Sequence, residues 1–281
     1  MREWAAEQRS ERGPRARVSH VRAILDEAAL GVGLNGVDRV VSVLGALEAS
    51  PGATLAEIAR AAGLSEPTVH RYLTALRDHR LVARDPYTGT YQLGIKLFEL
   101  GHDALPAPDP RGAARPYLRT LRDTFGETAE LAVHDNGRLI IIAVEEGLHD
   151  VAKGARVGEP DHWHSTSLGK AILAELDEQS AREILAVADR TRFTSRTLVD
   201  VDDVMASLRR VRADGYAIDD EESEIGLRCM GAAVRDAGGE PRFALSVSGP
   251  TYRITLEAIT TIAAAVHEAA TAISRELGWT G

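Results

Sequence analysis

The sequence predicts an α+β protein in which an N-terminal winged helix-turn-helix is joined by a linker helix to a mixed α/β domain. Three observations support this fold class. Apolar residues recur at helical spacing between positions 37 and 78, and two short β-like runs then flank a turn. After residue 108, two hairpin patterns alternate with helical ones. With 281 residues, the chain is long enough for two domains.

Composition describes a globular protein that does not coat nucleic acid by bulk charge. Hydrophobic residues make up 44% of the chain, and the formal net charge is −9. Contacts with nucleic acid must therefore come from a local surface of specific geometry. The single cysteine, Cys229, excludes an intramolecular disulfide. The start of the chain has no apolar signal core, and the longest apolar run is too short to span a bilayer. We therefore expect a cytoplasmic protein without a membrane partner.

Residues 1–36 form a predicted N-terminal extension. Its first part is rich in arginine and glutamate, which favours a solvated arm. Residues 18–30 have the pattern of a helix, and the glycines of residues 31–36 end it. A helix that contacts a second subunit is the alternative interpretation.

Residues 37–94 are predicted to form the winged helix-turn-helix. The first helix carries an apolar stripe, and Pro51-Gly52 ends it. The second begins at Thr54, whose capping box is completed by Glu57, and ends at a left-handed Gly63. Ser65 is the predicted cap of the third helix. The predicted stripe of the first helix consists of Val37, Val40, Val41, Leu44 and Leu47.

The third helix has an apolar face, formed by Val69, Tyr72, Leu73 and Leu76, that is predicted to pack inward. Two β-like runs follow it and flank the turn sequence DPYTG, which predicts a wing. The early residues of such a helix read base edges in the major groove of DNA, and helix N-termini favour phosphate. The predicted DNA-binding residues are Thr54, Ser65, Glu66, Thr68, His70, Arg71 and, in the wing turn, Tyr87. A solvated face on a structural bundle is the alternative.

Charge in this region is nearly balanced. Residues 37–105 contain seven lysines and arginines and eight aspartates and glutamates, a net charge of −1. Affinity for DNA would therefore depend on the placement of a few side chains, with help from dimerisation.

Residues 95–107 are the predicted linker helix, and the proline-rich stretch 106–110 marks the start of the second domain, residues 108–281. A helix follows, with Pro116 expected in its first turn. The first hairpin turns at residues 135–137 and the second at residues 236–239. Between them we expect a strand over residues 150–158 and helices over 167–176, 177–188 and 200–215. A long helix ends the chain.

The strand of residues 243–249 is informative by alternation. Phe243, Leu245 and Val247 point one way, whereas Ala244, Ser246 and Ser248 point the other. A face of small and hydroxyl side chains leaves room for a small polar ligand above the sheet. A solvent-exposed sheet face is the alternative interpretation.

Residues 161–171, DHWHSTSLGKA, contain two candidate sites. His162 and His164 would share a side of a strand and could begin a metal site, although no third ligand is fixed. The glycine and lysine do not complete a P-loop, because Ala171 follows Lys170. The helix start after Ser167 offers backbone N–H groups that suit a small carboxylate.

Cys229 and the acidic run of residues 219–224 are the remaining candidates. No motif pairs the cysteine with a base, so a buried or pocket-lining thiol is favoured over a nucleophile. Acidic runs are usually solvated, but this one follows a predicted strand, so one or two of its acids could line the edge of a pocket.

Residues 54–94 resemble the DNA-binding half of the IclR (isocitrate lyase regulator) family. Residues 168–174, 209–239 and 244–250 resemble its effector-binding half, in the family's order. The resemblance implies a bacterial transcriptional regulator, repressor or activator, with a GAF-like second domain that binds an effector and oligomerises. It implies double-stranded operator DNA, an organic acid or aromatic effector, and a homodimer or dimer of dimers. The implied effector-binding positions are Ser167, Leu168, Asp219, Leu227, Cys229, Ser246 and Ser248.

The resemblance implies no catalytic residue, no cofactor and no metal. The sequence departs from the family pattern at Glu66, where lysine or serine is common, and at residues 161–165, which are often apolar. Trp163 in that segment could stack on an aromatic effector. Two rival interpretations remain: a hydrolase that uses His162, His164 or Cys229, and a metal sensor.

Overall fold

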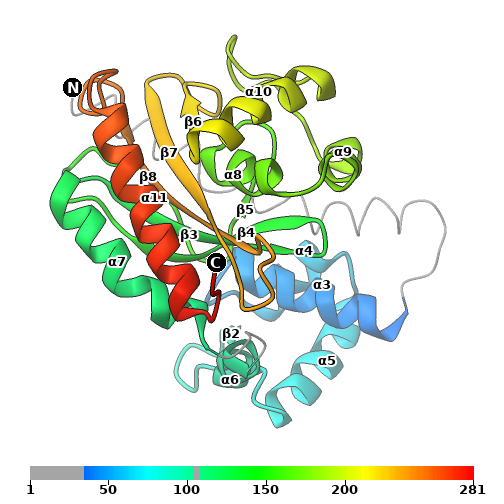
Figure 1. Ribbon diagram of the computed structural model, residues 1–281. Coiled ribbons are helices and arrows are strands. Elements are labelled where there is room, and N and C mark those ends of the chain that lie inside the picture. Colours follow the sequence, from blue (N-terminus) through cyan, green and yellow to red (C-terminus); the bar gives the residue numbers. More distant parts are fainter. Residues whose placement is uncertain (1–34, 104–107) are drawn as a thin grey trace. The chain divides into compact units, whose positions relative to one another are not determined.

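The computed structural model describes residues 35–103 and 108–281 (Figure 1). The chain divides into two compact units, Met1–Leu105 and Pro106–Gly281. The predicted helix at residues 18–30 and the end of the predicted linker lie outside the described residues. The exact boundaries of the four predicted segments (1–36, 37–94, 95–107 and 108–281) stay a prediction.

The first unit has the predicted winged helix-turn-helix. Its helices are α3 (Gly36–Ala49), α4 (Leu55–Ala62) and α5 (Glu66–Asp78), and the linker helix is α6 (Ile95–Asp103). Strands β1 (Val82–Arg84) and β2 (Tyr91–Leu93) pair antiparallel and form the wing.

Helix caps fix the ends of these helices. Thr54 and Glu57 form the predicted capping box of α4, and Gly63 ends the helix at a φ of 65°. Ser65 occupies the N-cap position of α5 but does not cap it as predicted, because its hydroxyl lies 2.9 Å from the Thr68 hydroxyl and bonds no helix N–H. Asn35, which the sequence reasoning missed, caps α3.

The core of the first unit differs from the predicted stripe on α3. Val37 is 70% exposed and Val41 is 43% exposed, whereas Val43 and Leu47 are fully buried. The buried residues of α3 begin only at Ser42. The neighbouring elements therefore cover the second half of the helix, and Val37 lies in a first turn that they do not reach.

The second unit is a six-stranded antiparallel sheet with helices on both faces. Its order is β5-β4-β3-β8-β7-β6. Helices α7 and α11 pack on one face, and α8 packs on the other with α9 and α10 beyond it (Figure 1). The strands are β3 (Thr128–Asp135), β4 (Arg138–Glu145), β5 (Pro160–Asp161), β6 (Ala217–Asp220), β7 (Leu227–Val234) and β8 (Phe243–Pro250). The helices are α7 (Pro110–Phe125), α8 (Ser167–Glu175), α9 (Glu178–Val187), α10 (Val201–Asp214) and α11 (Ile259–Glu276).

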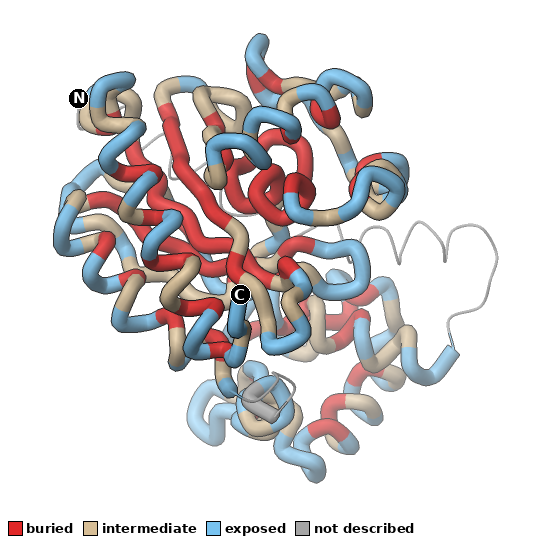
Figure 2. The backbone as a smooth tube through the Cα atoms, viewed as in Figure 1, coloured by how far each residue is buried: buried red, intermediate tan, exposed pale blue. Residues whose placement is uncertain are grey.

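Both faces of the sheet are buried (Figure 2). Phe243, Leu245 and Val247 belong to the core beneath α7 and α11, and Ala244 belongs to the core beneath α8. The predicted alternation of β8 is therefore confirmed, and the solvent-exposed alternative is wrong. A hydroxyl-rich surface of this sheet faces the interior, where each polar group needs a partner.

Two predicted elements are wrong. Residues 150–158 form no strand, because the segment makes isolated bonds in place of a ladder: the Lys153 carbonyl accepts from the Thr128 hydroxyl, and the Gly158 N–H donates to the Ile141 carbonyl. The short strand lies at residues 160–161 instead. Pro116 lies well inside α7, which begins at Pro110 behind the cap Asp109. Among the described helices, none has the length and apolar character needed to cross a membrane.

Candidate functional sites

The polar side of α5 is exposed above a buried apolar side. Val69 and Leu73 are almost fully buried, whereas Glu66, His70 and Arg71 are exposed. The guanidinium of Arg71 lies 5.5 Å from the centre of the Tyr72 ring, a cation–π contact between the charged end of this side chain and its neighbour on α5. Thr68, also on the predicted list, is half-buried.

Thr54, at the start of α4, and Tyr87, in the wing turn, are also predicted DNA-binding residues. The N–H and hydroxyl of Thr54 both donate to Glu57 Oε2 at 2.8 Å, so the cap already uses them. At the wing tip, Asp85 Oδ1 accepts from the N–H groups of Tyr87 and Thr88 at 2.7 and 3.0 Å. These bonds hold the turn in place and leave the Tyr87 side chain 96% exposed.

The sheet of the second unit brings the predicted effector positions together. Asp219, Cys229 and Ser248 are successive cross-strand partners on β6, β7 and β8. In the next row with this orientation, Ser246 lies opposite Gly231. Leu227 precedes Cys229 by two residues on β7, so its side chain points to the same side. All of these predicted positions are buried.

Helix α8 begins directly above this row. A Cβ on Gly231 would lie 2.8 Å from the backbone carbon of Ser167, so glycine is required for the helix to approach the strand this closely. Thr166 caps α8 by accepting a hydrogen bond from the Gly169 N–H at 3.2 Å. The positive end of the helix dipole therefore points at the hydroxyl-rich part of the sheet. Leu168 packs into the core beneath α8.

A charged cluster that the sequence reasoning missed lies on the same face. The Glu130 side chain on β3 is fully buried, and its Oε2 accepts from Lys153 Nζ at 2.9 Å and from the hydroxyls of Ser246 and Ser248 at 3.2 Å each. Lys153 comes from the segment mispredicted as a strand. The only sequence signal was an acid within an otherwise apolar strand, at Glu130.

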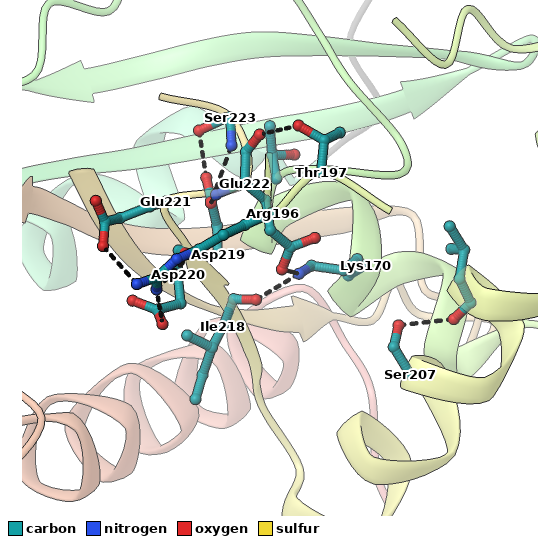
Figure 3. A network of polar contacts seen from close by, with 12 residues as sticks. Lys170, Arg196, Thr197, Ser207, Ile218, Asp219, Asp220, Glu221, Glu222 and Ser223 are labelled. Atoms are coloured by element: carbon teal, nitrogen blue, oxygen red, sulfur yellow. Dashed lines mark hydrogen bonds and ion pairs between the residues drawn. The ribbon is translucent and has the colours of Figure 1, made fainter. Parts of the chain in front are cut away.

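The acidic run is folded into the site instead of being solvated (Figure 3). Asp219 accepts from the N–H groups of Glu222 and Ser223 at 2.8 and 3.2 Å, and from the Ser223 hydroxyl. The ammonium of Lys170 on α8 bonds Glu222 and the Ile218 carbonyl. Burial raises the pKa of both Asp219 and Glu222, although Ser223 and Lys170 partly offset the effect.

The histidine pair does not form a metal site. His164 is buried with Nε2 3.0 Å from the Thr191 carbonyl, and burial lowers its pKa. Its ring lies 6.1 Å from that of His162, which packs against Phe193 instead. Within the described ranges, His, Cys, Asp and Glu form no group of three able to hold a metal ion.

Two further candidate residues, Cys229 and Trp163, are buried. Burial raises the pKa of the Cys229 thiol, the opposite of what a thiolate nucleophile needs. Trp163 is 4% exposed, donates to the Gly137 carbonyl at 2.9 Å and meets the His134 ring edge-on. Its indole therefore packs into the core beneath α8.

Comparison with known proteins assigns both units. The family model described as bacterial transcriptional regulator IclR C-terminal matches residues 102–275, and the IclR helix-turn-helix domain matches residues 36–86. The chain is 33% identical to the transcriptional repressor IclR of Escherichia coli, covering 82% of this chain and 85% of that protein. It is 32% identical to the regulator BhcR of Paracoccus denitrificans, with coverage of 86% and 87%.

Solved structures give the same result. The IclR of Thermotoga maritima has a TM-score of 0.73 at 30% identity and covers 86% of this chain and 98% of its own. An IclR homologue of Microbacterium hydrocarbonoxydans, complexed with 4-hydroxybenzoate, has a TM-score of 0.75 at 25% identity, with coverage of 85% and 97%.

Proposed function

This chain belongs to the IclR family of bacterial transcriptional regulators, and from that premise we propose that it binds a pseudo-palindromic operator as a homodimer or dimer of dimers under the control of a small organic acid or aromatic metabolite. It combines a helix-turn-helix DNA-binding domain with a C-terminal ligand-binding domain. Its matched relatives are transcriptional regulators and not enzymes. We place this activity in the cytoplasm.

The observation that carries the proposal is the exposed polar side of α5 on an otherwise acidic chain. Arg71 can reach guanine or a phosphate, Thr68 a thymine methyl, and His70 a base edge or phosphate. Glu66 at the start of α5 repels phosphate and selects bases that offer a donor, such as cytosine. The proposed DNA-binding set also includes Thr54 and Ser65 at the starts of α4 and α5, and Tyr87 at the wing tip.

The effector is proposed to bind on the α8 face of the sheet, at Ser167, Leu168, Asp219, Leu227, Cys229, Ser246 and Ser248. Buried hydroxyls beneath the start of a helix support this placement, because they offer hydrogen bonds and a favourable potential to a carboxylate. A solved relative supports a ligand of this kind, since the Microbacterium hydrocarbonoxydans homologue is complexed with 4-hydroxybenzoate.

The linker helix α6 is proposed to carry the signal. The effector must bind one arrangement of the subunits better than the other, otherwise it switches nothing. Three large apolar side chains of α6 are exposed: Ile95 by 62%, Phe98 by 66% and Leu100 by 50%. Ile95 and Phe98 are three residues apart and share one side of the helix, and exposed apolar side chains of this kind favour a contact with a second subunit.

The test begins with selection from a random-sequence DNA pool by the purified full chain. We expect the selected sites to contain two half-sites related by a two-fold axis. Organic acids and aromatic acids that raise the melting temperature should also change the affinity for the selected site in a gel-shift assay. Enrichment of no sequence, or selected sites without internal symmetry, would contradict the proposal.

A further inference from the structure

Glu130 has a carboxylate oxygen that finds no partner within the described part of the chain. Its side chain is 0% exposed, and its Oε2 collects bonds from Lys153, Ser246 and Ser248. Its Oε1 is equally buried and meets no hydrogen-bond donor among the described residues. Buried polar atoms are nearly always paired in native proteins, so an exception of this kind calls for a missing partner.

A second buried carboxyl lies in the same electrostatic environment. Asp161 Oδ2 on the edge strand β5 is also buried, and no donor from the described part of the chain reaches it. Burial raises the pKa of Asp161, Lys153 lowers it, and Glu130 raises it further. The ammonium of Lys153 thus bonds Glu130 and also favours the charged form of Asp161.

The hydroxyl of Ser165, between β5 and α8 in the chain, is a further buried polar group. It is fully buried just before α8 and, within residues 35–103 and 108–281, has no hydrogen-bond partner. Among the described residues, the unpaired buried atoms around α8 are three carboxylate oxygens (Glu130 Oε1, Asp161 Oδ2 and Glu222 Oε2), the Ser165 hydroxyl and one imidazole nitrogen, His164 Nδ1. Together they offer mainly acceptors, and a molecule that completes them must bring donors.

The proposed site has two ends. The acceptor end, at Glu130 and Asp161, is separate from the helix end, at the start of α8. The start of α8 rests on Gly231 of β7. Gly231 lies opposite Ser246 of β8, and Ser246 lies opposite Glu130 of β3. Glu130 and Gly231 are therefore two strand spacings apart, about 10 Å between backbones. A carboxylate is favoured below the start of α8 and is repelled beside Glu130 and Asp161.

We propose that the effector is an organic acid that also carries an ammonium or hydroxyl group, with its acid end below α8 and its donor end bound by Glu130 and Asp161. The inference rests on the proposed effector site on this sheet face. It adds two binding residues to that site and restricts the ligand class from simple acids to amino acids and hydroxy acids.

The experiment uses matched probes on the purified full chain. Straight-chain carboxylates of increasing length are each supplied in three forms: unsubstituted, with a terminal hydroxyl, and with a terminal amine. Benzoate, 4-hydroxybenzoate and 4-(aminomethyl)benzoate extend the series to aromatic acids. We expect at least one hydroxyl or amine form to bind tenfold or more tightly than its unsubstituted partner, as measured by calorimetry and by the rise in melting temperature.

Variants connect that preference to the two carboxyls. In Glu130→Gln, and independently in Asp161→Asn, the ratio between substituted and unsubstituted probes should fall by at least fivefold. Glu145→Gln is the matched control, because Glu145 bonds Arg119 and Arg122 on the sheet face that packs against α7. The control should keep the ratio of the unaltered chain. If Glu130→Gln does not fold, Asp161→Asn alone decides.

The outcomes separate this inference from the proposed function. If unsubstituted acids bind as tightly as their hydroxyl and amine forms, the inference is overturned and an organic-acid effector stands. An unchanged ratio in both variants overturns it as well. If no acid in any form binds, the organic-acid effector itself is overturned, and the inference falls with it.

Discussion

The acidic side chains around the two proposed binding sites of this regulator lie in opposite environments. In the helix-turn-helix, Glu57 and Asp85 are exposed, and local N–H groups lower the pKa of each. In the sheet unit, burial raises the pKa of Asp161, Asp219 and Glu222. The first arrangement stabilises the ends of helices and turns. The second costs stability, which is typical of a site built to bind something.

The difference follows from the size of each partner. A DNA duplex can be read only by side chains that project from the surface, such as Arg71 and Tyr87. A small molecule is held by enclosed groups in a low-dielectric interior, where a few charges discriminate strongly. The two units can therefore be tested separately, because a change in one should leave the other intact.

The largest effect is expected from Gly231→Val. The added side chain would overlap the backbone of Ser167, so α8 must move from the sheet, and we expect a loss of about 3 kcal/mol in the free energy of unfolding. Urea unfolding followed by Trp163 fluorescence measures it. Gly154→Ala is the control, because a Cβ there meets nothing within 4 Å. Equal stability of the two variants would contradict the close packing described for α8.

Arg71→Ala should produce the next largest effect, on the other unit. Loss of a base or phosphate contact should weaken operator binding about thirtyfold, or about 2 kcal/mol. Because Arg71 is exposed, the melting temperature should stay unchanged. Fluorescence anisotropy on the selected site measures the affinity. Arg77→Ala, an exposed arginine near the other end of α5, should bind nearly as the unaltered chain does. Unchanged affinity in Arg71→Ala would remove α5 from the proposed interface.

Thr54→Ala tests the caps of the helix-turn-helix. Removal of the hydroxyl breaks half of the capping box and should destabilise α4 by about 1 kcal/mol. Hydrogen exchange of α4 peptides reports the loss without interference from the sheet unit. Ser65→Ala is a matched control, since the Ser65 hydroxyl caps no N–H group. Faster exchange in the control than in Thr54→Ala would show that the two caps are assigned the wrong way round.

Asp161→Asn should produce the smallest effect and the opposite sign. The folded pKa of Asp161 is raised above its ordinary value of 3.8. Its favourable contribution is therefore present below about pH 4 and is lost as the pH rises through the raised value. At pH 7 the variant should be more stable than the unaltered chain by about 0.5 kcal/mol.

The advantage of Asp161→Asn should shrink as the pH falls toward 4. Burial lowers the pKa of His134 and His164, so these histidines destabilise the fold as the pH falls below 6.5. The measurement is therefore the difference between the chain and its variant at each pH, in which the histidine contribution cancels. A difference that is constant with pH would show that Asp161 does not titrate as its surroundings indicate.

Local signals were sufficient for the elements of the first unit, although not for the buried stripe of α3, and for most helices of the second. Thr54, Glu57 and Gly63 specify both ends of α4 within ten residues of sequence, and the turn at residues 135–137 specifies a hairpin. Such signals act between neighbours in the chain, so a single sequence displays them. The mispredicted strand at residues 150–158 lacks them, because its contacts are with residues far away in the chain, such as Thr128.

By itself, the sequence determined the order of elements, the winged helix-turn-helix and the hydroxyl-rich face of β8, because each depends on spacing along the chain. The tertiary structure alone decided that Glu130, Lys153 and Asp161 share one buried site, and that the acidic run folds onto Lys170. Those first three residues come from two strands and a segment outside the sheet, and only the folded chain brings Lys153 to Glu130. The charge balance that we propose selects the effector is therefore a property of the packed sheet, and it cannot be read along the chain.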